Sequence, residues 1–154
     1  MLGYFNMPEE TAQSFTADGY LKTGDLGYMD GENYLYLTGR AKNMIVTEGG
    51  KNVYPEEIEN EFQLYEEIDQ ILIRGYILDE KMKSESIEAL VYHNQEHKNA
   101  KGETPSMDEM KSRIDDIIKE VNQRLQPYQK INRFELLDKP LEMTTTKKIK
   151  RGNL

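Results

Sequence analysis

Residues 107–125, MDEMKSRIDDIIKEVNQRL, contain the most regular pattern of this chain. Apolar side chains recur there at steps of three and four residues, which is the spacing of one face of an α-helix. Pro127 follows them closely and cannot continue a helix. The pattern predicts a long amphipathic helix that ends near Pro127, with a core-facing side made of Met110, Ile114, Ile117, Ile118, Val121 and Leu125.

Short apolar runs lie on both sides of this helix. Residues 68–78 and 87–92 come before it and are predicted to be strands, joined by a charged turn. Residues 131–137 come after it and are predicted to be a final strand, with loop beyond Pro140. One long helix between short strands is typical of helices packed on a small sheet.

The first part of the chain predicts shorter elements. Residues 1–24 are interrupted by turn residues and indicate one short helix with loops. Asp30–Gly31, followed by alternating residues 34–37, indicates a hairpin, and residues 44–46 a further strand.

Pro55 suits the first turn of a second helix, with Ile58, Phe62 and Tyr65 on its apolar face and an acidic side that mostly faces water. The order of all these elements predicts an α+β fold, a small mixed sheet with packed helices. A boundary between Gly39 and Lys42 would separate residues 1–40 from residues 41–154.

Composition excludes several classes of function. The formal charge of −8 argues against broad nucleic-acid binding. The chain contains no cysteine, and its two histidines, His93 and His97, lie in a polar stretch, so we expect no metal site. Neither a transmembrane run nor a secretory signal is visible. We therefore expect a cytoplasmic protein, with peripheral attachment at a membrane left open.

Two charged residues could contact a nucleotide. Asp25, in a glycine-flanked turn, could accept hydrogen bonds from the vicinal hydroxyls of a ribose, although an ordinary Asx turn has the same composition. Arg40 offers fixed donors for ribose or phosphate oxygens, and an isolated surface arginine is the alternative.

Two further stretches are candidates on weaker grounds. Gly49–Gly50 could let the backbone approach a ligand closely or could form a simple turn. Residues 139–151 carry five basic residues against Glu142, which indicates either contact with a phosphorylated ligand or a frayed basic tail.

Four motifs together resemble the closing motifs of the adenylate-forming acyl-CoA synthetase and ligase superfamily. They are TGDLGYMD (23–30), LTGRAKNMIV (37–46), GGKNVYPEEIE (49–59) and TTTKKIKR (144–151), in that order. The last two are most similar to those of bacterial long-chain fatty acid–CoA ligases. The resemblance implies that residues 1–40 are the C-terminal tail of a large N-terminal adenylation domain and that residues 41–154 are the C-terminal lid domain.

The resemblance also implies a reaction and its substrates. A fatty acid and ATP, with Mg²⁺, would give an acyl-adenylate and pyrophosphate, and CoA would then give acyl-CoA and AMP. Asp25 would hold the ribose, and Arg40 would be a second nucleotide contact. Lys42 would be the hinge between two domain orientations, although a simple linker residue is the alternative. Gly49 and Gly50 would line the approach of CoA.

The last motif implies that Lys148 is the catalytic lysine of adenylation. Thr144, Thr146, Ile149 and Arg151 match the family pattern around it. Lys147 stands where glycine is commonest, which leaves two adjacent lysines, and the positions of Ile149 and Arg151 favour Lys148.

Other parts of such an enzyme are not found in this sequence. The phosphate loop and the large domain that forms the acyl pocket are missing, so we expect the chain to be inactive alone. Two alternatives stay open: an adenylation domain that loads a carrier protein, and a non-catalytic protein-binding module. The sequence leaves open the acid, the oligomeric state and the order of residues 1–40 without a parent domain.

Overall fold

The computed structural model of the chain describes residues 1–79, 84–99, 102–146 and 148–151. The chain divides into two compact units, Met1–Lys42 and Asn43–Leu154. The division falls directly after Lys42. The assignment of the first unit to a larger adenylation domain stays a prediction.

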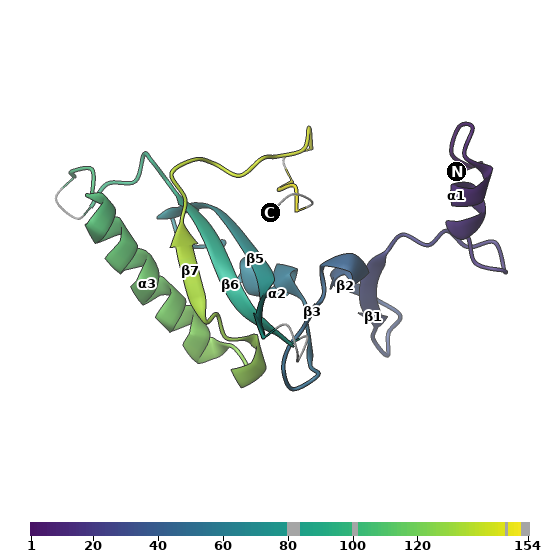
Figure 1. Cartoon of the computed structure of the whole chain (residues 1–154), viewed down its shortest axis with the longest axis horizontal. Coiled ribbons are helices and arrows are strands. Elements are labelled where there is room, and N and C mark those ends of the chain that lie inside the picture. The colour runs from purple at the N-terminus through teal and green to yellow at the C-terminus, as the bar shows by residue number, and fades with distance from the viewer. Residues whose placement is uncertain (80–83, 100–101, 147, 152–154) are drawn as a thin grey trace. The chain divides into compact units, whose positions relative to one another are not determined.

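The first unit contains one short helix and one hairpin. Helix α1 (Pro8–Gln13) precedes the antiparallel strands β1 (Asp25–Met29) and β2 (Leu35–Arg40), which lie side by side in Figure 1. Asp30 forms the turn, because its Oδ1 accepts hydrogen bonds from the backbone N–H groups of Glu32 and Tyr34, both at 2.9 Å. The predicted helix and hairpin are confirmed.

The second unit is built on a three-stranded mixed sheet. Its strands are β5 (Ile68–Asp79), β6 (Ser84–His93) and β7 (Arg133–Leu136), in the order β5-β6-β7. β5 pairs with β6 antiparallel, and β7 pairs with β6 parallel. Parallel pairing requires a long crossover, which helix α3 (Met107–Arg124) supplies. This sheet confirms the predicted α+β class. Residues 80–83 of the predicted turn lie outside the described residues.

Smaller elements complete this unit. The 3₁₀ turn η1 (Ala41–Asn43) crosses the division, and the short strands β3 (Ile45–Val46) and β4 (Asn52–Val53) pair antiparallel. Helix α2 (Pro55–Asn60) follows, and a second 3₁₀ turn, η2 (Pro127–Gln129), leads into β7. The sequence did not predict β4, because Asn52–Val53 contains no apolar run like that of residues 44–46.

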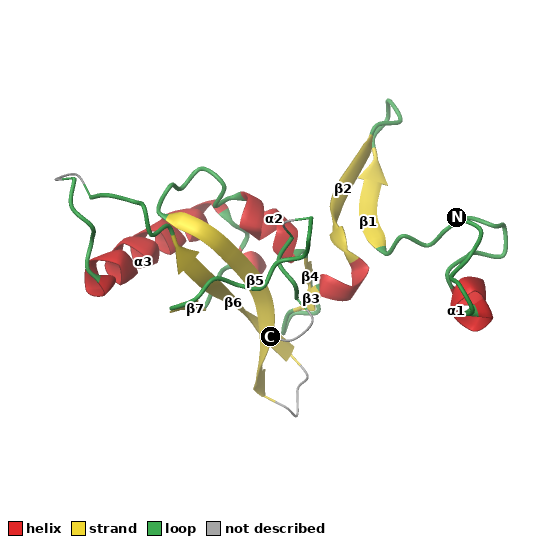
Figure 2. Ribbon diagram, turned by 90° about the horizontal axis from the view of Figure 1, so that it is seen from above, coloured by secondary structure: helices red, strands yellow, loops and turns green. Residues whose placement is uncertain are grey.

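Helix α3 begins and ends as its sequence predicts. Ser106 and Glu109 form a capping box, with the Ser106 N–H donating to Glu109 Oε2 at 2.8 Å. Its apolar face is buried against α2 and one face of the sheet, an arrangement visible in Figure 2. The members of this core cluster on α3 are Met110, Ile114, Ile117, Ile118 and Val121. None of the helices in the described ranges has the length and apolar character needed to cross a membrane.

Helix α2 is shorter than predicted. It ends at Asn60, so the prediction that Phe62 and Tyr65 extend its apolar face is wrong. Beyond the helix the N–H of Phe62 donates to the Glu59 carbonyl and that of Tyr65 to the Phe62 carbonyl, both at 3.1 Å. These three-residue turns still bury Phe62, which is 2% exposed.

The core predicts a clear contrast along α3. Ile117→Ala should lower the free energy of unfolding by about 2–5 kcal/mol, because Ile117 is fully buried and truncation leaves a cavity. Ser112→Ala, at an exposed position of the same helix, should change it by less than about 0.5 kcal/mol. Urea denaturation followed by circular dichroism measures both, and equal losses would contradict this packing.

Candidate active site

Asp25 and Arg40 lie opposite each other on the first unit's hairpin. Asp25 begins β1, Arg40 ends β2, and the two are direct partners in the register. Arg40 Nε lies 2.8 Å from Asp25 Oδ1, while the two side chains stay 48% and 32% exposed. The sequence motifs predict Asp25 and Arg40 as nucleotide contacts, but nothing in the sequence indicates that they form an ion pair.

This ion pair leaves donors and acceptors for a ligand. Among the described residues, Oδ2 of Asp25 and the Nη groups of Arg40 have no hydrogen-bond partner. A carboxylate held from one side can still accept hydrogen bonds from a ribose diol, and the free guanidinium edge can donate to phosphate oxygens. The geometry of this pair therefore fits a nucleotide.

The glycine loop of the second unit is a tight turn between β3 and β4. Gly50 has φ +68°, and its N–H donates to the Thr47 carbonyl at 2.8 Å. A Cβ at Gly49 or Gly50 would meet no atom within 4 Å. Gly50 is therefore required by the backbone conformation, while the surface of the loop stays open.

The last motif folds back on itself. The N–H of Thr144 donates to the Lys148 carbonyl at 2.8 Å, and the N–H of Lys148 donates to Thr144 Oγ1 at 3.2 Å. Two residues on, the N–H of Lys150 donates to the Glu142 carbonyl at 2.8 Å. Residues 142–150 thus form a hairpin-like loop, in which Lys147 lies outside the described residues.

Two anchors hold this loop on the sheet. Ile149 packs against a small apolar cluster of Leu72, Leu90 and Leu141. Because Leu72 and Leu90 alternate along their strands with residues of the main core, this cluster lies on the face opposite α3. Arg151, 23% exposed, is the second anchor.

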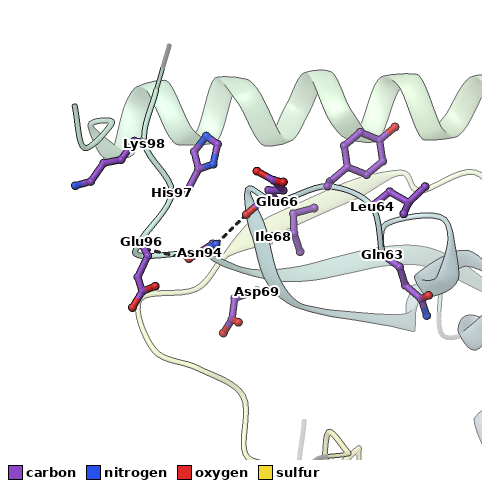
Figure 3. Close-up of a pocket in the computed structure, with 10 residues that line it drawn as sticks. Gln63, Leu64, Glu66, Ile68, Asp69, Asn94, Glu96, His97 and Lys98 are labelled. Atoms are coloured by element: carbon purple, nitrogen blue, oxygen red, sulfur yellow. Dashed lines mark hydrogen bonds between the residues drawn. The ribbon is translucent and has the colours of Figure 1, made fainter. Parts of the chain in front are cut away.

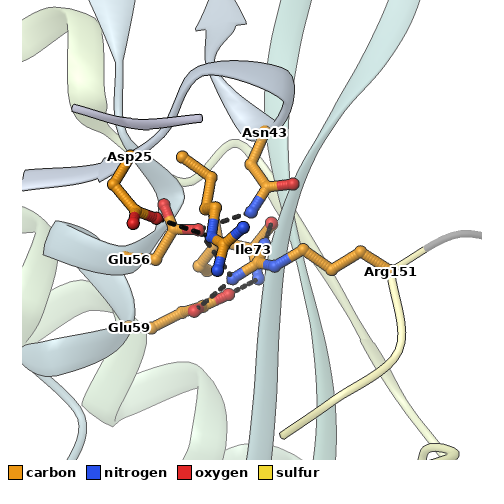
Figure 4. A network of polar contacts seen from close by, with 7 residues as sticks. Asp25, Asn43, Glu56, Glu59, Ile73 and Arg151 are labelled. Carbon is orange, nitrogen blue, oxygen red and sulfur yellow. Dashed lines mark hydrogen bonds and ion pairs between the residues drawn. The ribbon is translucent and has the colours of Figure 1, made fainter. Parts of the chain in front are cut away.

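Arg151 and Glu59 together cap the free edge of β5 (Figure 4). Arg151 Nη2 lies 2.5 Å from Glu59 Oε2, and its Nη1 donates to the Ile73 carbonyl at 3.0 Å. The N–H of Ile73 donates to Glu59 Oε1 at 2.8 Å. β5 is an edge strand, so these outward-facing backbone groups lack a strand partner. The side-chain pair supplies both hydrogen bonds.

Lys148 lies in the hairpin-like loop, directly before Ile149. Its side chain is exposed, and within the described part of the chain its ammonium has no hydrogen bond or ion pair. The backbone is fixed on both sides of Lys148, while the charge can reach an anion outside the unit. An unengaged ammonium on a fixed backbone is suited to stabilising charge that develops on a phosphate.

Burial raises the pKa of Glu59 to about 6, although Arg151 and the Ile73 N–H oppose that rise. The prediction that the acidic side of α2 faces water is therefore wrong for Glu59. The sequence missed this pairing because the partners are 92 residues apart. Glu59 and Arg151 both belong to the quoted motifs, and this shared membership is the sequence signal that could have indicated their contact.

One open depression of about 610 Å³ lies elsewhere on the second unit (Figure 3). It is lined by residues between Gln63 and Asp69 and between Asn94 and Lys98, and Asn94 Nδ2 donates to the Glu66 carbonyl there at 3.0 Å. None of the proposed site residues lines it. The candidate site is therefore a set of open surfaces and not this depression.

The chain is similar along its whole length to curated acyl-CoA ligases. It is 36% identical over 154 residues to the long-chain-fatty-acid–CoA ligase of Bacillus subtilis (strain 168), covering 100% of this chain and 24% of that enzyme. It is 31% identical over 160 residues to the long-chain-fatty-acid–CoA ligase FadD15 of Mycobacterium tuberculosis (strain ATCC 25618 / H37Rv), covering 97% and 26%. The chain is thus similar, in sequence and in fold, to a C-terminal portion of adenylate-forming acyl-CoA synthetases.

Solved structures of adenylate-forming enzymes have the same fold. The O-succinylbenzoate coenzyme A synthetase of Bacillus subtilis, in complex with ATP and a magnesium ion, matches with TM-score 0.71 and 30% identity, covering 97% of this chain and 27% of that one. The adenylation domain of a carboxylate reductase from Mycobacterium chelonae matches with TM-score 0.79 and 25% identity, covering 96% and 23%.

The chain spans about a quarter of the length of the two curated relatives, and the match is to a C-terminal portion. No protein-family profile matches it. The resemblance predicted from the four motifs is confirmed.

The raised pKa of Glu59 predicts a specific pH dependence. The folded protein binds a proton at Glu59 more tightly than the unfolded chain does, in which the pKa of this glutamate is 4.5. The tighter proton binding stabilises the folded state. This stabilisation is fully present below pH 4.5 and is lost as the pH rises through about 6. The unfolding free energy of the wild type minus that of Glu59→Gln should therefore fall by about 1–2 kcal/mol across this window.

Urea denaturation at a series of pH values measures this difference. Glu61→Gln, an exposed glutamate just beyond α2, is the matched control. A difference that stays constant or rises with pH would contradict the burial of Glu59.

Proposed function

We propose that this chain is the closing part of an ATP-dependent fatty acid–CoA ligase and supplies its adenylation lysine, Lys148. The observation that carries the proposal is the placement of Lys148, whose backbone is fixed by Thr144, Ile149 and Arg151 while its ammonium stays unengaged among the described residues. A mobile loop could not deliver a charge with comparable accuracy.

In the first half-reaction, a fatty acid carboxylate attacks the α-phosphorus of ATP and displaces pyrophosphate. Two anions approach each other, and negative charge spreads over phosphate oxygens in the transition state. The ammonium of Lys148 would offset that charge where it develops. Asp25 would accept hydrogen bonds from the ribose, and Arg40 would orient Asp25 and contribute a second nucleotide contact.

Mg²⁺ would accompany the nucleotide in this half-reaction and partly neutralise its phosphates. The described residues contain no group of three or more His, Asp or Glu side chains placed to hold a metal ion. In the part described, the chain therefore offers no cage of its own for the metal.

In the second half-reaction, CoA displaces AMP from the acyl-adenylate. Lys42 would be the hinge that allows the lid to present a different surface, and its place directly before the division of the chain supports this role. The open loop at Gly49 and Gly50 would then line the approach of CoA.

The names of the relatives favour a fatty acid and CoA as partners. The two relatives that match this chain over nearly all of its length are long-chain-fatty-acid–CoA ligases. Their names support CoA over a carrier protein as acceptor. They also favour an enzyme over a non-catalytic binding module. Because the phosphate loop and acyl pocket would belong to another domain, the chain by itself should be inactive.

The role of Lys148 predicts a split between the two half-reactions. In the complete enzyme, Lys148→Ala should lower fatty-acid-dependent ATP–pyrophosphate exchange by about 10²–10³-fold, the size of effect expected for one donor to a developing charge. Thioester formation from preformed acyl-adenylate and CoA should stay within about twofold, because that step does not need the lysine.

Lys150→Ala is the matched control, since Lys150 lies in the same loop and pairs with Glu142 at 3.3 Å. Lys147→Ala tests the adjacent lysine of the motif. Near-normal exchange in Lys148→Ala, or a larger loss in Lys147→Ala, would overturn the assignment.

A further inference from the structure

Glu56 links Asn43, the first residue of the second unit, to Arg151. Asn43 Nδ2 donates to Glu56 Oε1 at 2.6 Å, and Arg151 Nη2 lies 3.7 Å from the same oxygen. Figure 4 shows Asn43, Glu56 and Arg151 converging on one point beside Glu59. Neither the motifs nor the proposed chemistry assigns Glu56 a role.

The carboxylate that makes this contact is partly buried, since the Glu56 side chain is 28% exposed. Oε2 is buried and has no hydrogen-bond partner among the described residues. A buried acceptor without a partner is unfavourable, so its presence in a folded protein calls for an explanation. The Asn43 hydrogen bond to Oε1 is itself partly buried, and a hydrogen bond is stronger in such surroundings than in open water.

The Asn43 contact determines where the second unit becomes rigid. Asn43 directly follows Lys42, and the next residue fixed by the core is Ile45, which is 2% exposed. Without the hydrogen bond, the backbone could rotate at each residue between Lys42 and Ile45. With it, Asn43 is fastened to α2, and rotation is limited to Lys42.

We propose that Glu56 is a positioning residue that confines the hinge to Lys42 by anchoring Asn43, and that keeps the Lys148 loop in register with that hinge through Arg151. This inference rests on the proposed function, since it assumes that the lid turns about Lys42. A single well-defined pivot returns a rigid lid to the same two orientations, whereas a longer pivot spreads each orientation over many positions.

A longer pivot has a recognisable kinetic result. Reacting groups that are slightly misplaced lose rate without losing substrate affinity. Asn43→Ala and Glu56→Ala should each lower kcat of both half-reactions by about five- to tenfold and leave the KM for ATP within about twofold. Since the two variants break the same hydrogen bond, the double variant should be no slower than Glu56→Ala alone.

The test uses the complete enzyme, with pyrophosphate exchange and thioester formation measured separately. Gln63→Ala is the matched control, because it removes an exposed hydrogen bond, 2.9 Å long, to Asn60 at the end of the same helix. It should leave both half-reactions within about twofold. Should Glu56→Ala fail to fold, Asn43→Ala decides, because it leaves the carboxylate beside Arg151 in place.

Three results would overturn the inference. They are an unchanged kcat in Asn43→Ala, effects that multiply in the double variant, and a loss of stability with no change in either half-reaction. Lys148→Ala in the same assays separates this failure from failure of the proposed function. If Lys148→Ala abolishes exchange and Asn43→Ala does nothing, only the role of Glu56 is wrong. If Lys148→Ala also leaves exchange unchanged, both the proposed function and the role of Glu56 are wrong.

Discussion

The free edge of β5 is the constraint on which the second unit depends. Ile73 needs a donor and an acceptor on the side of β5 that no strand covers, and Arg151 and Glu59 provide them. In doing so they join α2, the sheet and the end of the chain at one point. The position of Lys148 follows from this point, since only two residues separate it from Arg151.

This arrangement favours position over stability. Burial raises the pKa of Glu59 even though a guanidinium lies against it, so removing the carboxylate from water costs more than the ion pair returns. A comparable geometry recurs at Glu88, which is buried between Arg74 and Arg133. There burial alone would raise the pKa, but hydrogen bonds from both arginines hold it below its usual range. The contacts of Glu88 therefore stabilise the sheet, whereas the pair of Glu59 and Arg151 fixes the position of the last motif.

Local patterns in the sequence were sufficient for most of the fold. The spacing of apolar residues predicted α3, and the Asp30–Gly31 turn predicted the hairpin, because both depend on neighbours a few residues away. The end of α2 was mispredicted, since Phe62 is buried by three-residue turns that keep an apolar spacing like that of a helix.

The candidate site was predictable as a set of residue types but not as contacts. Motifs pointed to Asp25, Arg40 and Lys148 separately. Long-range pairing joined Asp25 to Arg40 across a hairpin and Arg151 to Glu59 across most of the second unit. No spacing in one sequence encodes such pairs, because they depend on how the sheet orders its strands.

Amide hydrogen exchange in Arg151→Met tests most directly whether this edge contact holds the Lys148 loop. Methionine keeps much of the side chain's length but cannot donate to Ile73 or pair with Glu59. Exchange at the Ile73 and Lys150 amides should speed up by about tenfold or more, while amides of the central strand β6 keep their protection. Unchanged protection at both Ile73 and Lys150 would contradict it.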